Sequence, residues 1–216
     1  MATRAAVAQL TRLEADIRQC RICRDDPQGP PLPHEPRPVV RVSSTARIAI
    51  CGQAPGTRVH ASGMPFTDAS GDRLRAWMDV SSDEFYDVSH MAIVPMGFCF
   101  PGLDAKGGDR PPRKECAALW HERLFCAMPQ LELLLLVGGY AQRWHLPGRE
   151  RASLTEVVAD WQLISQPGDT RTHRGIRAFP LPHPSWRNNG WLKAHAWFER
   201  ELLPALRAEV RLRLKR

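Results

Sequence analysis

Four short apolar runs, separated by segments of helical pattern, constrain the fold of this chain more than any other feature. They occupy residues 47–52, 90–95, 131–137 and 176–181. Short apolar runs that stop at Gly or Pro are typical of strands buried on both faces. Because helical segments separate the runs, we predict an α/β fold with three layers, α/β/α, around a central four-stranded parallel sheet.

Helical spacing of apolar residues predicts the segments that cover this sheet. The first helix is expected over residues 5–22, where Leu13 and Ile17 share one face. Ser70 is expected to cap the second helix, and Pro204 to bend the last one. The helices after the first are expected at residues 70–80, 115–128 and 139–145, and from about residue 190 to the C-terminus.

The chain has 216 residues, a length that suits one globular domain, so we expect residues 1–216 to form a single domain. Six prolines fall among residues 27–38, and this density excludes a helix there. We therefore expect an extended Pro-rich wrap over residues 24–42. A basic tail is expected at residues 205–216, where five Lys and Arg residues face one Glu.

Basic residues outnumber acidic ones, with 30 Lys and Arg against 23 Asp and Glu. The net charge of +7 favours a polyanionic partner, although the basic tail is equally well explained as a solvated helix end. No apolar run reaches the roughly 18 residues of a transmembrane helix, and the N-terminus lacks the apolar core of a secretory signal. We therefore expect a cytoplasmic, nucleoid-associated protein with no membrane partner.

Three unusual loops follow the predicted strands, at residues 52–68, 95–112 and 182–192. The carboxyl ends of parallel strands meet at one edge of a sheet, and ligands bind there. The first loop opens with Gly-Gln-Ala-Pro-Gly at residues 52–56, a rigid turn that can approach a planar ligand closely. A tight turn without any ligand has the same pattern. Phe66, shortly before a helix, adds an aromatic ring to the same crevice.

The third loop carries a histidine between two prolines, His183, and the stiff backbone restricts its orientation. Such a side chain suits proton transfer to a reacting group, although a histidine satisfied within its own loop has the same pattern. Arg187, Asn188 and Trp191 follow it and offer a phosphate contact, an amide and a stacking surface. The loop is therefore a candidate nucleic-acid contact.

In this order and at these strand ends, the three loops resemble the uracil-DNA glycosylase superfamily, most closely its family 4. That family's first motif is Gly-Glu-Ala-Pro-Gly, then Gly-x-Pro-Phe and a Gly before a helix, and its last motif is His-Pro-Ser. The matching residues are Gly52, Ala54, Pro55, Gly56, Gly63, Pro65, Phe66, Gly71, His183, Pro184 and Ser185. The resemblance covers roughly residues 15–205 and implies a monofunctional DNA glycosylase of base excision repair.

The resemblance implies that uracil or another deaminated base is extruded from single-stranded or mismatched DNA before its N-glycosidic bond is hydrolysed. Phe66 is expected to stack on the base beside the turn at residues 52–56. A neutral imidazole on His183 is expected to donate to the base carbonyl as the bond breaks. We expect the protein to act as a monomer. The residues expected to contact DNA are Arg110, Arg113, Ser185, Arg187 and Asn188.

The cysteines follow the family 4 layout for a [4Fe-4S] cluster. The ligands that this layout implies are Cys20, Cys23, Cys99 and Cys116. Such a cluster would tie the Pro-rich wrap to the core of the protein. A structural zinc ion on the same four thiolates, and four thiols without metal, are the alternatives. Cys51 and Cys126 are expected to be ordinary core thiols.

Departures from the family 4 motifs leave the water-activating and base-reading residues open. Gln53 replaces the motif's Glu, and Ala54 stands where the best-known family has its catalytic Asp. Water is then expected to be oriented by Gln53, His60 or Asp68, and Asp68 is equally well suited to cap the following helix. Pro95 stands where an Asn reads uracil. The backbone expected to replace that Asn belongs to Met96, Gly97 and Phe98.

Two other functions fit part of this pattern. A DNA-binding protein that recognises damage or abasic sites with little or no excision is favoured by the missing Asn and carboxylate. An enzyme that acts on a free nucleobase derivative would not need Arg187 or the basic tail. An intact His183 and Phe66 favour the glycosylase over the binding protein.

Overall fold

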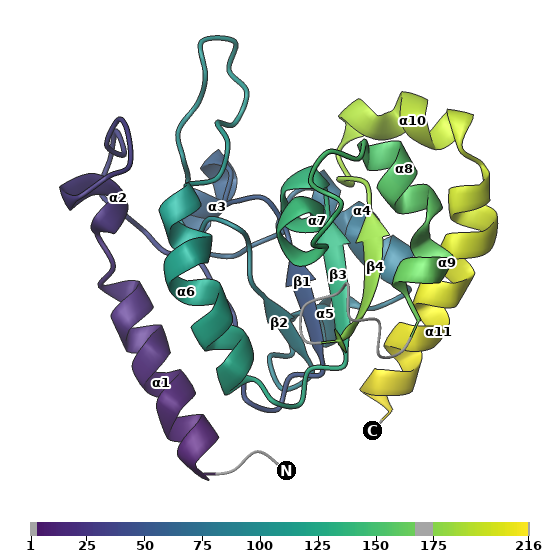
Figure 1. Ribbon diagram of the computed structural model, residues 1–216, viewed down its shortest axis with the longest axis horizontal. Helices are drawn as coiled ribbons and strands as arrows, with labels where there is room; N and C mark the ends of the chain where they lie inside the picture. Colours follow the sequence, from purple (N-terminus) through teal and green to yellow (C-terminus); the bar gives the residue numbers. More distant parts are fainter. Residues whose placement is uncertain (1–3, 167–174, 216) are drawn as a thin grey trace.

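The computed structural model describes residues 4–166 and 175–215, and within them the four predicted strands form one parallel sheet (Figure 1). The strand order is β2-β1-β3-β4, and every neighbouring pair is parallel. The strands are β1 (Ile48–Cys51), β2 (Met91–Ile93), β3 (Leu133–Val137) and β4 (Arg177–Leu181). The parallel four-stranded sheet predicted from the apolar runs is therefore confirmed.

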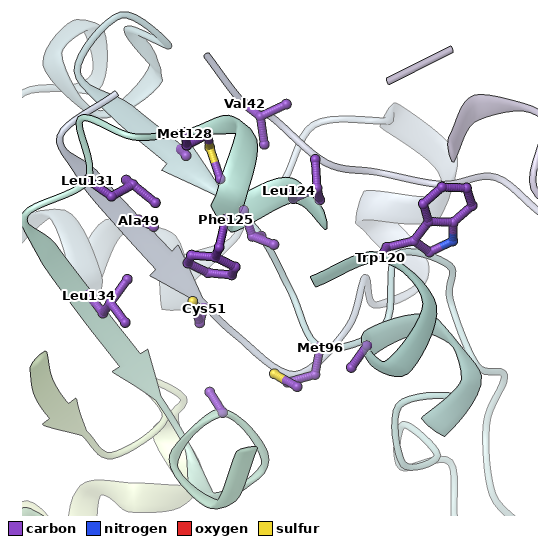
Figure 2. Close-up of a cluster of buried hydrophobic side chains, with 14 of the residues drawn as sticks. Val42, Ala49, Cys51, Met96, Trp120, Leu124, Phe125, Met128, Leu131 and Leu134 are labelled. Carbon is purple, nitrogen blue, oxygen red and sulfur yellow. The ribbon is translucent and has the colours of Figure 1, made fainter. Parts of the chain in front are cut away.

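Helices cover both faces of this sheet, which explains why its strands are almost entirely apolar. Ala49 and Cys51 of β1 face one core, whereas Ile48 and Ile50 face the other. Figure 2 shows the first core, where Phe125 points toward β1. The first core lies under α1 (Arg4–Arg18), α6 (Lys114–Ala127) and α7 (Gly139–His145). The second lies under α4 (Ala69–Met78), α5 (Ser82–Tyr86) and α11 (Leu203–Leu214).

Several short helices complete the described part of the chain. Residues 52–68, expected to be a loop, contain a helical segment, and the two segments between α7 and β4 were not predicted. These elements are shorter than two turns, and so few residues carry no readable period. They are α2 (Ile22–Asp25), α3 (Thr57–Ser62), α8 (Leu154–Ala159), α9 (Trp161–Ile164), the 3₁₀ turn η2 (Trp186–Asn188), α10 (Asn189–Ala194) and the π-helical turn η3 (Phe198–Leu202).

The last predicted helix is interrupted at His195, and not at Pro204. The His195 ring stacks on Trp191 with centroids 4.4 Å apart, and its Nδ1 lies 2.8 Å from the Trp191 carbonyl oxygen. These contacts end α10. Pro204 falls at the start of α11, directly after the π-helical turn η3, so the regular α-helical pattern is disturbed just before the proline. The expected bend at Pro204 itself stays a prediction.

The helix α4 is capped by Asp68, and not by the predicted Ser70. The Asp68 carboxylate accepts hydrogen bonds from the Gly71 N–H at 3.3 Å and from the Ser70 hydroxyl at 2.6 Å. Ser70 is already inside the helix. The capping role that the sequence left open for Asp68 is therefore present in the structure.

The Pro-rich wrap contains no helix or strand between residues 26 and 40, as its proline content predicts. It covers the edge of the sheet that β2 forms. The Arg41 N–H donates to the Ile93 carbonyl oxygen at 3.0 Å, and the Ile93 N–H donates to the Arg41 carbonyl oxygen at 2.7 Å. The Val39 N–H donates to the Phe98 carbonyl oxygen at 2.7 Å. An edge strand covered in this way cannot pair with another chain.

The basic tail forms most of α11, and its arginines hold this helix against the rest of the protein. Arg207 donates to the carbonyl oxygens of Trp77 and Ala76 at the end of α4, and Arg211 pairs with Glu84. Arg213 is buried. These contacts use the tail's arginines within the fold, and Arg216 lies outside the described residues. In the part of the chain that the structure describes, no helix is long and apolar enough to cross a membrane.

Candidate active site

A pocket of about 380 Å³ lies beyond the carboxyl ends of the strands, as the order of the loops predicts. We call it the strand-end pocket. Loops that follow β1, β2 and β4 line it together. The predicted site residues that line it are Gly52, Gln53, Ala54, Pro55, Gly56, Phe66, Asp68 and His183. Met96, Gly97, Phe98 and His60 do not line it.

Phe66 is fixed in a left-handed backbone conformation, with φ of 56°. Its carbonyl oxygen accepts hydrogen bonds from the Tyr86 hydroxyl at 3.0 Å and from Arg75 at 3.1 Å. Its ring meets the edge of Phe85 with centroids 5.9 Å apart. A Cβ atom at Gly71 would lie 1.8 Å from that carbonyl oxygen, so only glycine fits there. The aromatic wall of the pocket is thus held in place by its backbone.

The turn at residues 52–56 is tied to the segment that follows β2. The N–H groups of Met96 and Gly97 donate to the carbonyl oxygens of Gly52 at 2.9 Å and Gln53 at 3.0 Å. The Phe98 N–H donates to the Cys116 sulfur at 3.2 Å. These three N–H groups are therefore used inside the protein. The reading of a base expected of the backbone of Met96, Gly97 and Phe98 would therefore have to use groups other than these N–H groups, and none of the three residues lines the pocket.

His183 lies in the pocket wall with two carboxylates near its ring. Burial lowers the pKa of His183 and so does Arg187, whereas the charges of Asp68 and Asp109 oppose that change. The net shift is downward, so the imidazole is neutral near pH 7. The Asn188 side-chain amide donates to the His183 carbonyl oxygen at 2.7 Å. Asn188, predicted to contact DNA, thus orients the histidine loop.

Asp109 is a pocket residue that the sequence did not single out. It comes from the loop after β2, and its carboxylate is close enough that a Cβ at Gly56 would lie 3.4 Å from Oδ2. Burial raises the pKa of Asp109, and the nearby Arg187 and His183 act against this. An acidic residue in a loop at a strand's carboxyl end was the available signal.

His60 lies on α3 with its ring turned to a different group of residues. Its centroid is 4.3 Å from the His34 ring and 5.6 Å from the Phe100 ring. Burial lowers the pKa of His60, and His34 and Arg37 add to this effect. The structure therefore packs His60 against the Pro-rich wrap, outside the strand-end pocket.

The predicted phosphate contacts divide into buried and exposed side chains. Arg113 is largely buried and donates to the Pro30 carbonyl oxygen at 2.7 Å and to Glu115 at 2.5 Å. The Arg110 carbonyl oxygen accepts from the Gln53 amide at 3.3 Å, and no ion pair holds its guanidinium among the described residues. Arg113 is therefore engaged in the fold, whereas Arg110 remains available to a ligand.

The histidine loop exposes a different tryptophan from the one expected. Trp186 is 73% exposed, the highest value among the exposed large apolar side chains that the structure describes, and the Arg187 guanidinium lies over its ring at 5.8 Å. Trp191 packs into the second core and donates its indole N–H to Thr155 at 2.8 Å. The Ser185 carbonyl oxygen accepts from Arg73 at 3.1 Å. Trp186, and not Trp191, is the available stacking surface.

The four predicted cysteine ligands come from distant segments and lie within electrostatic range of one another. Burial raises the pKa of Cys116, and the thiolate charges of Cys99, Cys23 and Cys20 add to that effect. Burial likewise raises the pKa of Cys99 to about 12. In the described residues, no group of three or more His, Cys, Asp or Glu side chains is positioned to hold a metal ion. The donor types suit a cluster, because iron–sulfur clusters are held by four thiolates.

A comparison with protein families finds one match, which covers more than half of the chain. The matching family model is described as the uracil DNA glycosylase superfamily, and it spans residues 40–207. The matched segment contains all three pocket loops and two of the four cysteines, Cys99 and Cys116. Cys20 and Cys23 precede it, so the match carries no information about a shared metal site.

Proposed function

The chain belongs to the uracil DNA glycosylase superfamily, and from this premise we propose that it hydrolyses the N-glycosidic bond of uracil or another deaminated base in DNA. The observation that carries the proposal is the strand-end pocket, where a fixed aromatic ring, a neutral histidine and two carboxylates line one cavity. Its volume of about 380 Å³ suits a single nucleobase with part of its sugar.

Base capture uses Phe66 and the turn at residues 52–56. A base within a duplex is out of reach of any pocket, so the target nucleotide must be extruded, at a cost of a few kcal/mol. The extruded base stacks on Phe66, and stacking of this kind contributes about 1–3 kcal/mol. The turn has a glycine at each end, Gly52 and Gly56, and glycine has no side chain. The backbone of the turn can therefore approach the flat base closely.

His183 acts on the leaving base. Cleavage of the N-glycosidic bond leaves negative charge on the base and positive charge on the sugar. The neutral imidazole donates a hydrogen bond to the base carbonyl, where the negative charge develops. A lowered pKa keeps the ring neutral, which avoids the desolvation of a buried cation before the substrate arrives.

The pocket carboxylates act on the sugar and the water. Asp68 is held by hydrogen bonds from Gly71 and Ser70, so its orientation is fixed before the substrate binds. We assign to Asp68 the stabilisation of the cationic sugar and the orientation of the attacking water. Asp109 faces the same cavity and adds to the negative potential there. Gln53 supplies an amide at the pocket rim, and His60 has no role in this assignment.

DNA contacts follow from the exposed residues around the pocket. Trp186 projects from the loop that carries His183, so its ring can occupy the space that the extruded base leaves. Arg110 and Arg187 lie near the pocket, and their charges suit backbone phosphates. The phosphate contacts require no paired strand, and the Trp186 contact suits a duplex weakened by a mismatch, so single-stranded or mismatched DNA is the proposed substrate.

A [4Fe-4S] cluster is the proposed cofactor, with Cys20, Cys23, Cys99 and Cys116 as its ligands. A cluster at this position would contribute structural stability, by joining the start of the Pro-rich wrap to the loop after β2 and to α6. Protein purified without oxygen is then expected to be brown and to lose its colour and part of its stability when Cys23 becomes Ala. A Cys126→Ala variant is the control. Iron content near zero in the anaerobic protein would overturn the assignment.

The proposed activity is tested on labelled single-stranded oligonucleotides that carry uracil, hypoxanthine or xanthine. Alkali cleaves the abasic sites that excision leaves. His183→Ala is expected to lower the single-turnover rate by about two to four orders of magnitude with nearly unchanged affinity, since the lost bond forms mainly in the transition state. Asp68→Asn, which keeps the helix cap, is expected to lower the rate less. If the parent protein binds all three oligonucleotides and excises nothing, it is a damage-binding protein.

A further inference from the structure

A second cavity, which we call the side pocket, adjoins the strand-end pocket at His183. Its volume is about 160 Å³, and it lies where β3 ends, between α7 and the histidine loop. Gln53 and His183 line both cavities. The two cavities therefore adjoin each other, with these two residues as their common wall.

The two cavities differ in charge. Asp68 and Asp109 line the strand-end pocket, which suits a neutral base and a cationic sugar. No carboxylate is found among the described residues that line the side pocket, and Arg143 is one of them. A phosphate is therefore repelled from the first cavity and attracted to the second.

Arg143 and Tyr140 form the outer wall of the side pocket. The Arg143 guanidinium lies over the Tyr140 ring at 5.0 Å from its centroid. No ion pair with a carboxylate holds Arg143 within the part of the chain that the structure describes, whereas Arg113, Arg211 and Arg213 are all paired. A Cβ at Gly139 would approach the Arg143 guanidinium to 3.0 Å. The glycine thus leaves room for the guanidinium beside the opening.

We propose that the side pocket binds the nucleotide adjacent to the extruded one, with Arg143 on its phosphate and Tyr140 against its base. The inference rests on the proposed function and makes it more specific. The cavity has room for a phosphate, and the base lies on the exposed Tyr140 ring at its rim. In a duplex the neighbouring base is stacked and paired, so this contact forms only with single-stranded DNA. Of the two proposed substrates, this contact therefore favours single-stranded over mismatched DNA.

The test uses binding without turnover, on single-stranded oligonucleotides that carry a tetrahydrofuran abasic analogue. Three probes have neighbours on both sides of the analogue, on its 5′ side only, or on its 3′ side only. Tyr140→Ala is expected to weaken binding about tenfold for the probe with both neighbours and for one of the two single-neighbour probes, the one whose neighbour reaches the side pocket. The other single-neighbour probe is expected to bind the variant and the parent equally. Tyr140→Trp is expected to retain parent affinity. Arg143→Gln is expected to lower the slope of log K against log salt by about 0.7.

Arg123→Gln is the matched control, because Arg123 lies over the Trp120 ring at 4.8 Å but lines neither cavity. Equal affinities of parent and Tyr140→Ala for every probe would overturn the inference, and so would an equal loss on all three. Excision by the parent protein is measured separately. If Tyr140→Ala weakens binding only for the two probes that carry the neighbour reaching the side pocket and the parent protein excises nothing, the proposed function is overturned. The assignment of the side pocket to the adjacent nucleotide is then retained.

Discussion

Two loops contribute to the walls of the strand-end pocket and are held in very different ways. The first pocket loop, residues 52–68, is joined to the core by backbone hydrogen bonds from Met96 and Gly97 and by those that Tyr86 and Arg75 donate to Phe66. The tip of the second pocket loop, residues 101–110, is held chiefly by bonds within itself. The Asp104 carboxylate accepts from two N–H groups of the same loop, and Leu103 pairs with Asp109.

The difference separates a preformed wall from an adjustable one. Figure 1 shows the second pocket loop rising away from the sheet between β2 and α6. Gln53 provides a link between the two loops, a hydrogen bond of 3.3 Å to the Arg110 carbonyl oxygen. We infer that stacking on Phe66 is built into the fold, whereas the position of Asp109 depends on a loop with few contacts outside itself. Changes in the first loop should therefore affect stability, and changes in the second mainly function.

The largest expected effect that distinguishes the two loops is that of an added methyl group. Gly71→Ala is expected to destabilise the protein by about 3 kcal/mol, because the new Cβ would overlap the Phe66 carbonyl oxygen. In an unconstrained helix the same change would stabilise by about 1 kcal/mol. Gly107→Ala in the second loop meets no atom within 4 Å, and its φ of +76° costs only about 1 kcal/mol. Urea unfolding measures both. Equal losses would remove the distinction.

A smaller effect on stability and on DNA binding is expected from Arg110 and Arg113, two arginines at the C-terminal end of the second pocket loop. Arg113→Gln is expected to cost about 2 kcal/mol, since it removes a partner of the buried Glu115, and to leave the salt dependence of DNA binding unchanged. Arg110→Gln is expected to preserve stability and to lower the slope of log K against log salt by about 0.7 on single-stranded DNA. A lower slope for Arg113→Gln would mean that this loop opens when DNA binds.

The smallest effect concerns the carboxylate that the second loop brings into the pocket. The folded-state pKa of Asp109 is raised above its unfolded value of 3.8, so its ionisation disfavours folding at neutral pH. Because Asp109 is exposed, solvent screens this effect. Asp109→Asn is therefore expected to stabilise the protein at pH 7 by at most about 0.5 kcal/mol, and the gain should disappear as the pH falls through 3.8. Thermal unfolding across this range measures it. A loss of stability at pH 7 would show that Asp109 holds the loop in place.

The agreement between sequence and structure is closest where a pattern is local. The apolar runs predicted all four strands, because a strand buried on both faces must be apolar along its whole length. The motif at residues 52–56 and the His-Pro-Ser motif predicted two walls of the pocket, since Pro restricts the backbone and Gly allows conformations and close approaches that other residues do not. Side-chain roles were predicted less well. His60 follows the same motif, and its ring packs against His34 instead.

The sequence by itself determined the parallel sheet, the edge of that sheet at which the pocket lies, and the residues Phe66 and His183 that line it. These follow from periodicity and from backbone restriction, which act over a few neighbouring residues. Only the tertiary structure decided that Asp109 shares the pocket, that Trp186 is exposed in place of Trp191, and that Arg143 has no carboxylate partner among the described residues. Burial and charge pairing depend on side chains that are distant in the chain, and these meet only when the sheet brings its loops together.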